Sequence, residues 1–189
     1  MPTLLPFRQY DEHDVVNLFA FSGTLPVTKG TLVKPQGSGW RTDEAGDIQL
    51  LGPVGASFAN TVSERYGTRP RVVTAGTGDS PIGMLLYDVR EQDENGLLLK
   101  FSPRKAAEMQ CVRSGQTVPM ATRGIFLVSG EFNGGAIAGD PLFPSGAGLW
   151  TSSTTGQNNG SNEHCNSKVG KLLGAPNSKG HALVLLNIC

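Results

Sequence analysis

Glycine and proline interrupt this chain so often that long regular helices have little room. Twenty-five glycines and twelve prolines are spread over 189 residues. They separate short runs rich in β-branched and aromatic residues, which is typical of β-strands. The pattern predicts an all-β fold, a β-barrel or sandwich of about ten to twelve short antiparallel strands. The predicted strands are residues 15–21, 31–33, 47–51, 71–74, 82–89, 97–101, 111–112, 118–128, 169–173 and 182–188, with a strand-turn-strand unit at 134–143.

Strands that are neighbours in the sequence are expected to pair with one another. Residues 15–21 and 31–33 are predicted to form one hairpin. Residues 169–188 are predicted to form another, because a polar turn there joins two apolar runs. Residues 71–101 are predicted to form a three-stranded meander. The segment 34–41, KPQGSGWR, is rich in Gly, Pro and Ser and is predicted to be a loop.

One segment is similar to a second segment further along the chain. SGTLPVTKGTLV (residues 22–33) resembles SGQTVPMATRGIFL (residues 114–127), which is two residues longer. In each, a proline follows an aliphatic residue, and a glycine (Gly30 or Gly124) leads into an apolar run. Proline fits a strand start or edge, and glycine supplies the backbone angles of a turn or bulge. We expect two related hairpins in one sheet system, with a chance match as the alternative.

Two segments have helical character, and neither is long. Residues 57–66 place apolar side chains on one face and are the stronger helix candidate, while residues 103–109 would form one or two turns. The predicted organisation is therefore an extended N-terminal arm, residues 1–14, followed by a β-rich domain, residues 15–189, with one short helix. A subdivision of that domain, if present, would fall near residues 105–113.

The predicted arm carries isolated apolar anchors among polar neighbours. Pro2 and Pro6 argue against a helix there. The anchors, which we take as candidates for partner contact, are Leu4, Leu5, Phe7 and Tyr10. The alternative is an arm that packs on its own domain.

The charge balance and the cysteine count exclude several classes of protein. Sixteen basic and sixteen acidic residues give a net charge of zero. A general nucleic-acid-binding protein would carry a basic excess, so we expect no nucleic-acid partner. No apolar run reaches 18 residues, so we expect no membrane span. Three scattered cysteines without a CxxC pair predict free thiols.

No stretch of the sequence carries a recognisable catalytic or metal-binding pattern. The loop 76–81, GTGDSP, is rich in glycine and contains Ser80, but it matches neither a phosphate-binding loop nor a nucleophile elbow. His13, His164 and His181 share no metal-ligand spacing. We therefore predict no catalytic residue, no cofactor and no metal ion.

Five further residues are candidates for contact with a partner. Arg65, Arg69 and Arg71 form a basic cluster that could bind a phosphate or a carboxylate, with surface pairing as the alternative. Trp40 and Trp150 lie beside glycine-rich segments and could anchor an interface, with core packing as the alternative.

Three quoted segments together resemble one class of viral protein. GTRPRVVTAGTGDSPIGMLLYDVRE (67–91), PRKAAEMQ (103–110) and SGQTVPMATRGIFLVSG (114–130) are similar to structural proteins of tailed-bacteriophage heads, in particular the capsid decoration, or cement, proteins of large marine cyanophages. The C-terminal order of VGKLLG (169–174) and ALVLLNI (182–188) is similar to short capsid-decorating β-barrels. The resemblance covers the chain from about residue 10 and lies in the order of turns.

The resemblance implies a non-enzymatic virion protein that binds the outer surface of an assembled capsid. Its partner would be the major capsid protein, and it would brace neighbouring capsid subunits against the pressure of packaged DNA. Self-association on the capsid lattice is a further expectation, as are synthesis in the host cytoplasm and a final location on the capsid surface.

Two other functions are also considered. One is a phage tail or baseplate component, or a receptor-binding β-domain, whose polar loop 151–166 would contact a host glycan. The other, which we rank lower, is a small hydrolase that uses Ser80 as its nucleophile.

Overall fold

The structure is a computed structural model that describes residues 3–42, 68–113, 116–130, 132, 136–152 and 168–188. The predicted strand at 47–51 and the predicted helix at 57–66 lie outside these residues. The described part is an all-β sandwich with one short α-helix, in agreement with the predicted fold class.

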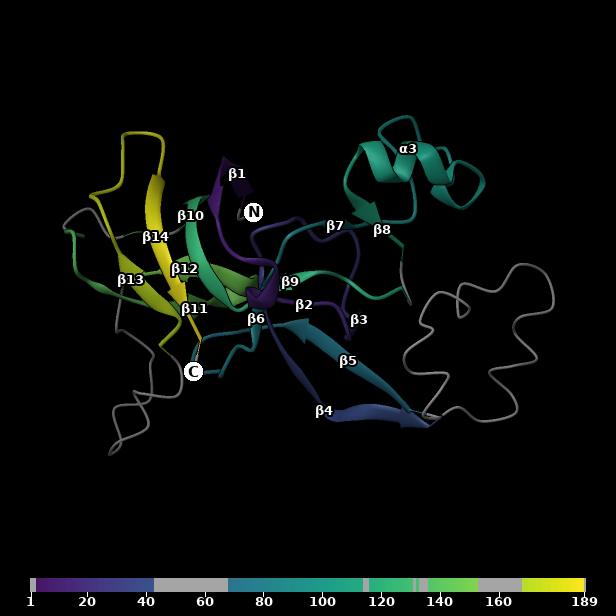
Figure 1. Ribbon diagram of the computed structural model, residues 1–189, viewed down its shortest axis with the longest axis horizontal. Coiled ribbons are helices and arrows are strands. Elements are labelled where there is room, and N and C mark those ends of the chain that lie inside the picture. The colour runs from purple at the N-terminus through teal and green to yellow at the C-terminus, as the bar shows by residue number, and fades with distance from the viewer. Residues whose placement is uncertain are drawn as a thin grey trace.

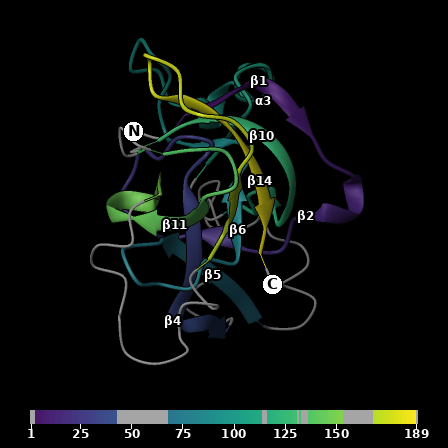
Figure 2. The ribbon, with the colours of Figure 1, turned by 90° about the vertical axis from the view of Figure 1, so that its left-hand side faces the viewer.

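Two six-stranded sheets form the sandwich, and Figures 1 and 2 show them from two directions. The first sheet has the order β1 (Thr3–Gln9), β10 (Arg123–Ser129), β14 (His181–Asn187), β13 (Gly170–Leu172), β11 (Pro141–Ser145) and β12 (Leu149–Thr151). The second sheet has the order β2 (Val15–Val16), β9 (Met120–Ala121), β6 (Gly83–Leu85), β4 (Leu32–Thr42), β5 (Thr68–Thr74) and β3 (Ala20–Phe21).

A smaller unit projects from the sandwich on the side away from β13 and β14 (Figure 1). It spans residues 88–113 and is called the knob below. Its elements are β7 (Asp88–Val89), the 3-10 helix η3 (Leu99–Phe101), α3 (Pro103–Glu108) and β8 (Cys111–Val112). Two other 3-10 turns, η1 (Glu12–Asp14) and η4 (Gly146–Gly148), belong to the body of the molecule.

Apolar side chains from both sheets fill the space between them. In β14, alternate residues are buried, and β10 shows the same alternation over its second half. A strand places successive side chains on opposite faces, so one face of each strand enters the core. Phe126 and Val184 of the first sheet meet Leu32 and Met84 of the second sheet in this cluster.

The second sheet is buried on both faces near its centre. All three residues of β6 are buried. Met84 joins the core between the sheets, whereas the next residue, Leu85, joins a second cluster with Phe21 and Val72. A strand that reads as a continuous apolar run is the expected result when both faces are covered.

The two similar segments do not form the predicted hairpins. In residues 22–33 the chain enters β4, which pairs with β5 and β6 and not with the strands before it. In residues 114–127 the chain leaves β9 in the second sheet and enters β10 in the first. The apolar area that these segments bury on two different sheets therefore outweighs the tendency of each turn to form a local hairpin. The expected backbone role of glycine is confirmed, because Gly30 and Gly124 both have positive φ.

Other local pairings were also predicted incorrectly. Residues 34–41 form most of β4, and an irregular register between Pro35 and Trp40 accommodates the glycines and the proline that suggested a loop. The meander over 71–101 is absent from the described residues, since β5 and β6 each pair with β4 and residues 99–101 form a 3-10 helix. The predicted strand at 15–21 is split into β2 and β3.

The predicted C-terminal hairpin and the helical turns predicted at 103–109 are confirmed, whereas the stronger helix candidate, residues 57–66, lies outside the described residues. β13 and β14 pair as an antiparallel hairpin, and α3 begins at the predicted proline. Of the strand-turn-strand unit predicted at 134–143, only the second strand is present in the described residues, as the start of β11 at Pro141. Residues 105–113, where a subdivision was considered, lie in α3 and β8. The two sheets exchange strands across that point, because β1 joins β10 and β9 joins β2.

Candidate partner-binding surface

The outer face of the first sheet carries aliphatic side chains where a solvent-facing sheet would carry polar ones. Ile125 of β10 is directly opposite Leu185 of β14, and Leu127 is opposite Leu183. Opposed residues of an antiparallel pair lie on the same face of a sheet. All four side chains are half-buried, and they alternate with fully buried neighbours that point into the core. We call these four residues the aliphatic face.

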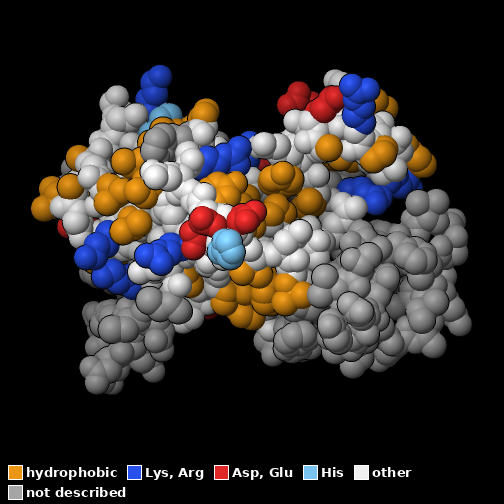
Figure 3. Space-filling model, in the orientation of Figure 1, with side chains coloured by type: hydrophobic (Ala, Val, Ile, Leu, Met, Phe, Trp, Pro, Cys, Tyr) orange, Lys and Arg blue, Asp and Glu red, His pale blue; other side chains and the backbone are white. Residues whose placement is uncertain are grey.

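Polar and basic residues surround the aliphatic face at positions that the register fixes. Gln9 is opposite Ile125, and Lys171 is opposite Leu185, so both extend the same row of side chains. Arg123, two residues before Ile125, lies on the same face and is exposed. Figure 3 shows hydrophobic side chains over β14 with basic side chains beside them. An apolar centre with Arg123 and Lys171 at its margin suits a partner surface that is apolar with acidic groups opposite these two side chains.

The N-terminal segment is extended, as predicted, but it lies on its own domain. β1 pairs with β10 at the edge of the first sheet, and Leu4 is 4% exposed in the core. The interpretation of Leu4 as a partner contact was therefore wrong. Leu5 is half-buried, and Tyr10 is 39% exposed with its ring stacked on Phe126 at 5.7 Å. The side chain of Phe7 lies outside the described residues.

A shallow hollow of about 370 Å³ lies beside Tyr10. Tyr10, Ile125 and Leu185 give it an apolar side, and Asp11 and Asp14 give it an acidic side. Arg123 also lines it. We call it the Tyr10 hollow, and it lies where the end of β1 meets the margin of the aliphatic face.

The two carboxylates of the Tyr10 hollow are fixed by the turn that contains them. Asp11 caps η1, since its Oδ1 accepts hydrogen bonds from the His13 backbone N–H at 3.0 Å and pairs with His13 Nδ1 at 2.7 Å. Asp14 Oδ2 accepts from the Asp11 backbone N–H at 3.2 Å. The hydrogen bonds from His13 lower the pKa of Asp11 below its ordinary value, which keeps this carboxyl group ionised.

The knob carries half of the exposed large hydrophobic side chains found in the described residues. Leu97 is 63% exposed, Leu98 is 38% exposed and Phe101 is 74% exposed. The Lys100 ammonium lies 4.8 Å from the centre of the Phe101 ring, a cation–π contact. Residues of this type on a projecting unit indicate an interaction surface.

A buried carboxylate organises the loop that presents these residues. Asp93 Oδ1 accepts hydrogen bonds from the backbone N–H groups of Asn95 and Leu97, both at 2.8 Å. Asp93 Oδ2 forms an ion pair with Lys105 of α3. The Lys105 ammonium lowers the pKa of Asp93 below its ordinary value, so the carboxylate is charged at neutral pH.

Polar contacts attach the base of the knob to the sandwich. Gln110 Oε1 accepts hydrogen bonds from Arg8 of β1 and from Lys29 Nζ, each at 3.3 Å. The Lys29 backbone N–H donates to Asp88 Oδ1 at 2.8 Å. These hydrogen bonds hold the knob beside β1, and Val89 and Val112 add apolar contacts with the second cluster.

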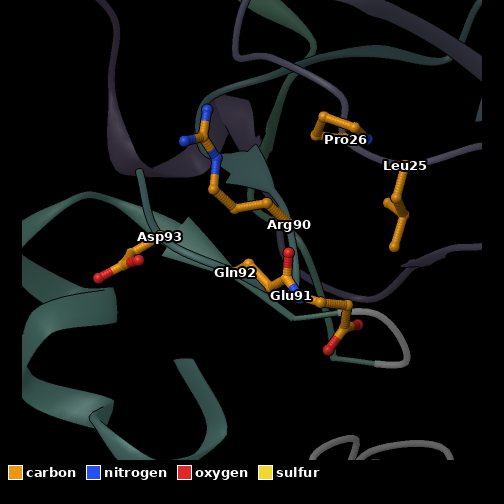
Figure 4. Close-up of a pocket in the computed structure, with 6 residues that line it drawn as sticks. All are labelled: Leu25, Pro26, Arg90, Glu91, Gln92 and Asp93. Carbon is orange, nitrogen blue, oxygen red and sulfur yellow. The ribbon is translucent and has the colours of Figure 1, made fainter. Parts of the chain in front are cut away.

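A second hollow, of about 350 Å³, lies between the knob and residues 25–26 (Figure 4). Its polar side chains do not converge on one point: Asp93 turns toward the helix, and Glu91 points in another direction. Arg90 is paired with Asp88 at 3.2 Å, although its Nε atom is buried without a partner. Because the charges are mixed and turned apart, this hollow defines no ligand class.

Of the remaining contact candidates, only Trp150 and Arg71 have described side chains, and these two lie in different sheets. Trp150 is fully buried, because its indole N–H donates to the Gly30 carbonyl at 2.9 Å inside the core. The prediction that Trp150 anchors an interface was therefore wrong. Arg71 is half-buried in β5. Arg65 and the side chains of Trp40 and Arg69 lie outside the described residues.

The loop that contains Ser80 is a closed turn. Asp79 Oδ2 accepts a hydrogen bond from the Gly76 backbone N–H at 2.6 Å and pairs with Lys34 at 2.8 Å. Ser80 is exposed at the end of this turn. Among the described residues, no three His, Cys, Asp or Glu side chains are grouped as metal ligands, and no helix is long and apolar enough to cross a membrane.

Sequence reasoning missed both apolar surfaces, the half-buried aliphatic face and the exposed side chains of the knob. The strand ALVLLNI has apolar residues at successive positions, which marks both of its faces as apolar. The run LLLKF at 97–101 follows a polar turn and was taken for a strand, although three adjacent leucines cannot all be buried in a small unit.

Comparison of the chain with protein-family models, with curated proteins and with solved structures gave no match.

Proposed function

We propose that this protein binds the outer surface of a tailed-phage capsid through the aliphatic face and stabilises the shell by bridging neighbouring capsid subunits. The observation that supports the proposal most is the aliphatic face itself: four aliphatic side chains in register on the outside of an ordered sheet. The resemblance of residues 67–130 to phage head proteins supplies the class of partner.

The surface chemistry is suited to attachment to a repeating lattice. Burial of apolar area contributes about 25 cal/mol per Å², from which the cost of association is subtracted. The affinity of a single contact of this size would be modest. Many identical sites on one shell would compensate for this low affinity. A protein that contacts two subunits at once binds more tightly, because the second subunit is present at a high effective concentration.

β1 shows features that prevent a different mode of binding. An exposed sheet edge can pair with a strand of another chain. β1 contains Pro6, which has no N–H to donate, and its register with β10 shifts between Leu4 and Arg8. A proline and an irregular register are common protections of edge strands. We therefore assign binding to the face of the sheet and not to its edge.

The test is co-sedimentation of the purified protein with undecorated capsids of its own virus. A Leu127→Asn/Leu183→Asn variant should lower occupancy by about tenfold, which corresponds to about 1.4 kcal/mol. The matched control is Ile137→Asn, because Ile137 is equally apolar, is 64% exposed and lies in a turn outside the aliphatic face. Thermal unfolding of each variant establishes that its fold is intact.

Equal occupancy of the double variant and the control would exclude the aliphatic face as the contact. Deletion of the N-terminal segment is a poorer test, because it removes β1 and the core residue Leu4. Immunogold labelling of virions adds an independent result. Label on the tail instead of the head would replace this proposal with the tail or receptor-binding function.

A further inference from the structure

We infer that the knob of one copy docks in the Tyr10 hollow of a second copy, so that copies of this chain associate head to tail. The occupant of the hollow would be Phe101 with Lys100 beside it. This contact goes beyond the proposed function, because it joins the binding proteins to one another and requires no shell.

The knob is an apolar projection, with large hydrophobic side chains that stay exposed in the described part of the chain. Phe101 and Leu97 are among the most exposed large hydrophobic residues of the described part, although the rest of the chain has an ordered core to bury such residues. Their exposure is built into the unit, since the Leu97 backbone N–H is held by the buried Asp93 carboxylate. A projection held in this way is pre-organised to bind, which lowers the entropy cost of docking.

The Tyr10 hollow fits this projection in size and in polarity. Its volume of about 370 Å³ can hold a phenylalanine side chain and part of a leucine. Its apolar side, formed by Tyr10, Ile125 and Leu185, offers an exposed aromatic ring and two aliphatic side chains. Aromatic side chains are common anchors in protein interfaces when they enter such a hollow.

The charges of the two surfaces are also complementary. On the knob, Lys105 is paired with Asp93 and Arg104 with Glu108, while Lys100 lies over the Phe101 ring and pairs with no carboxylate of the described residues. Glu94 is the exposed acid of the same loop. Lys100 therefore is the cation that would accompany Phe101 into a partner.

The hollow provides the opposite charge. Asp11 and Asp14 outnumber Arg123 in its lining, which leaves one net negative charge. Figure 3 shows the acidic and histidine side chains over η1 at the middle of the molecule, and the knob stands apart at one end. Charge complementarity of this kind selects a partner and its orientation.

The contact would be of the heterologous type, because the two surfaces are different parts of the chain. Such contacts produce rings or open chains of subunits. An interface this small is expected to be weak in dilute solution. Because Ile125 and Leu185 belong to the aliphatic face as well as to the hollow, a docked knob and a capsid surface compete for these two residues.

The first experiment places a photo-reactive benzoylphenylalanine at position 101 of the otherwise native protein, which is irradiated at high concentration without capsids. Covalent dimers are expected, with cross-links that mass spectrometry maps to residues 9–14 or 123–125. The control places the same probe at Ile137, which is similarly exposed. No dimers, or cross-links from position 101 to another surface, would overturn the inference.

The second experiment exchanges the charges. Lys100→Glu in the probe-bearing chain should lower the dimer yield about fivefold, and a partner chain with Asp14→Lys should restore it. Lys179→Glu makes the same charge change in an exposed turn away from the knob and should leave the yield unchanged. An unchanged yield with Lys100→Glu, or no restoration by Asp14→Lys, would contradict the docking.

Because these measurements use the free protein, they separate the two proposals. Docking without capsid binding would leave this inference standing and remove the proposed function. Capsid binding without cross-linked dimers would support the proposed function and overturn this inference.

Discussion

The sandwich and the knob present apolar surface to solvent in two different ways. The aliphatic face is formed by strand register: two long strands place Ile125, Leu127, Leu183 and Leu185 together, and their buried neighbours fix the position. The knob has few buried side chains, and hydrogen bonds to one carboxylate, Asp93, shape the loop before its exposed residues.

The two surfaces should therefore respond differently when stabilising contacts are removed. Loss of packing between the sheets should affect both sheets cooperatively, since one hydrophobic cluster joins strands of both. Loss of the polar contacts in the knob should open the knob alone, because regions with few apolar contacts open locally.

Trp150→Ala should have the largest effect. Trp150 is fully buried, and its removal leaves a large cavity and an unpaired Gly30 carbonyl. We expect the free energy of unfolding to fall by about 3 to 5 kcal/mol, measured by urea denaturation. Trp150→Phe keeps most of the side-chain volume and should lower the free energy of unfolding by less. A small loss with Trp150→Ala would show that the sandwich is not one cooperative unit.

Gly170→Ala should also destabilise the sandwich strongly. A Cβ at Gly170 would lie 1.9 Å from the Leu185 carbonyl oxygen, so β13 could not pair with β14 in its present register. We expect a loss of about 1 to 3 kcal/mol or more in chemical denaturation. Gly174→Ala, four residues further on, meets nothing within 4 Å and is the matched control. Equal effects of the two substitutions would contradict the strand register.

Asp93→Ala should loosen the knob and spare the sandwich. It removes the acceptor for the Asn95 and Leu97 backbone N–H groups and leaves Lys105 without its partner. Amide hydrogen exchange of residues 93–109 should accelerate by about tenfold, while exchange in β10 and β14 stays unchanged. An acceleration that extends through β10 and β14 would mean that knob and sandwich unfold together.

Acid below pH 3.8 should open the knob by protonating the same carboxylate. Because Lys105 lowers the pKa of Asp93 from its ordinary value of 3.8, the stabilising contribution is present above that value and is lost as the pH falls through the lower, folded-state pKa. The protection factors of the knob amides, which correct for the pH dependence of intrinsic exchange, should therefore fall at a pH below 3.8. Asp93→Asn should abolish this dependence, and a retained dependence would point to another group.

The smallest expected effect concerns the thiol of Cys111 in β8. Burial raises the pKa of Cys111, and the nearby Asp88 carboxylate adds to this effect, so the reactive thiolate is scarce at neutral pH. In a Cys165→Ser/Cys189→Ser background, labelling by a thiol reagent should be slow in the native protein and faster with Asp93→Ala. Identical rates would show that the knob base stays closed when its loop is loosened.

The sequence was sufficient for the features that depend on neighbouring residues. Turn residues at short intervals indicated an all-β fold, the polar turn at 175–180 indicated the hairpin of β13 and β14, and the proline at 103 indicated the start of α3. The candidate surfaces were only partly predicted. Of the four N-terminal anchors, Leu5 is half-buried and Tyr10 lines a hollow, whereas Leu4 is in the core.

The partners of the strands, and therefore the surfaces, were decided only by the tertiary structure. Local sequence indicates that a residue such as Leu185 lies in a strand, but it does not indicate which strand lies opposite or what covers each face. Those choices follow from the burial of apolar area across distant segments, which placed β1 beside β10 and β9 beside β2. The same burial of apolar area across distant segments placed Trp150 in the core and the two similar segments in different sheets, and it left Phe101 exposed.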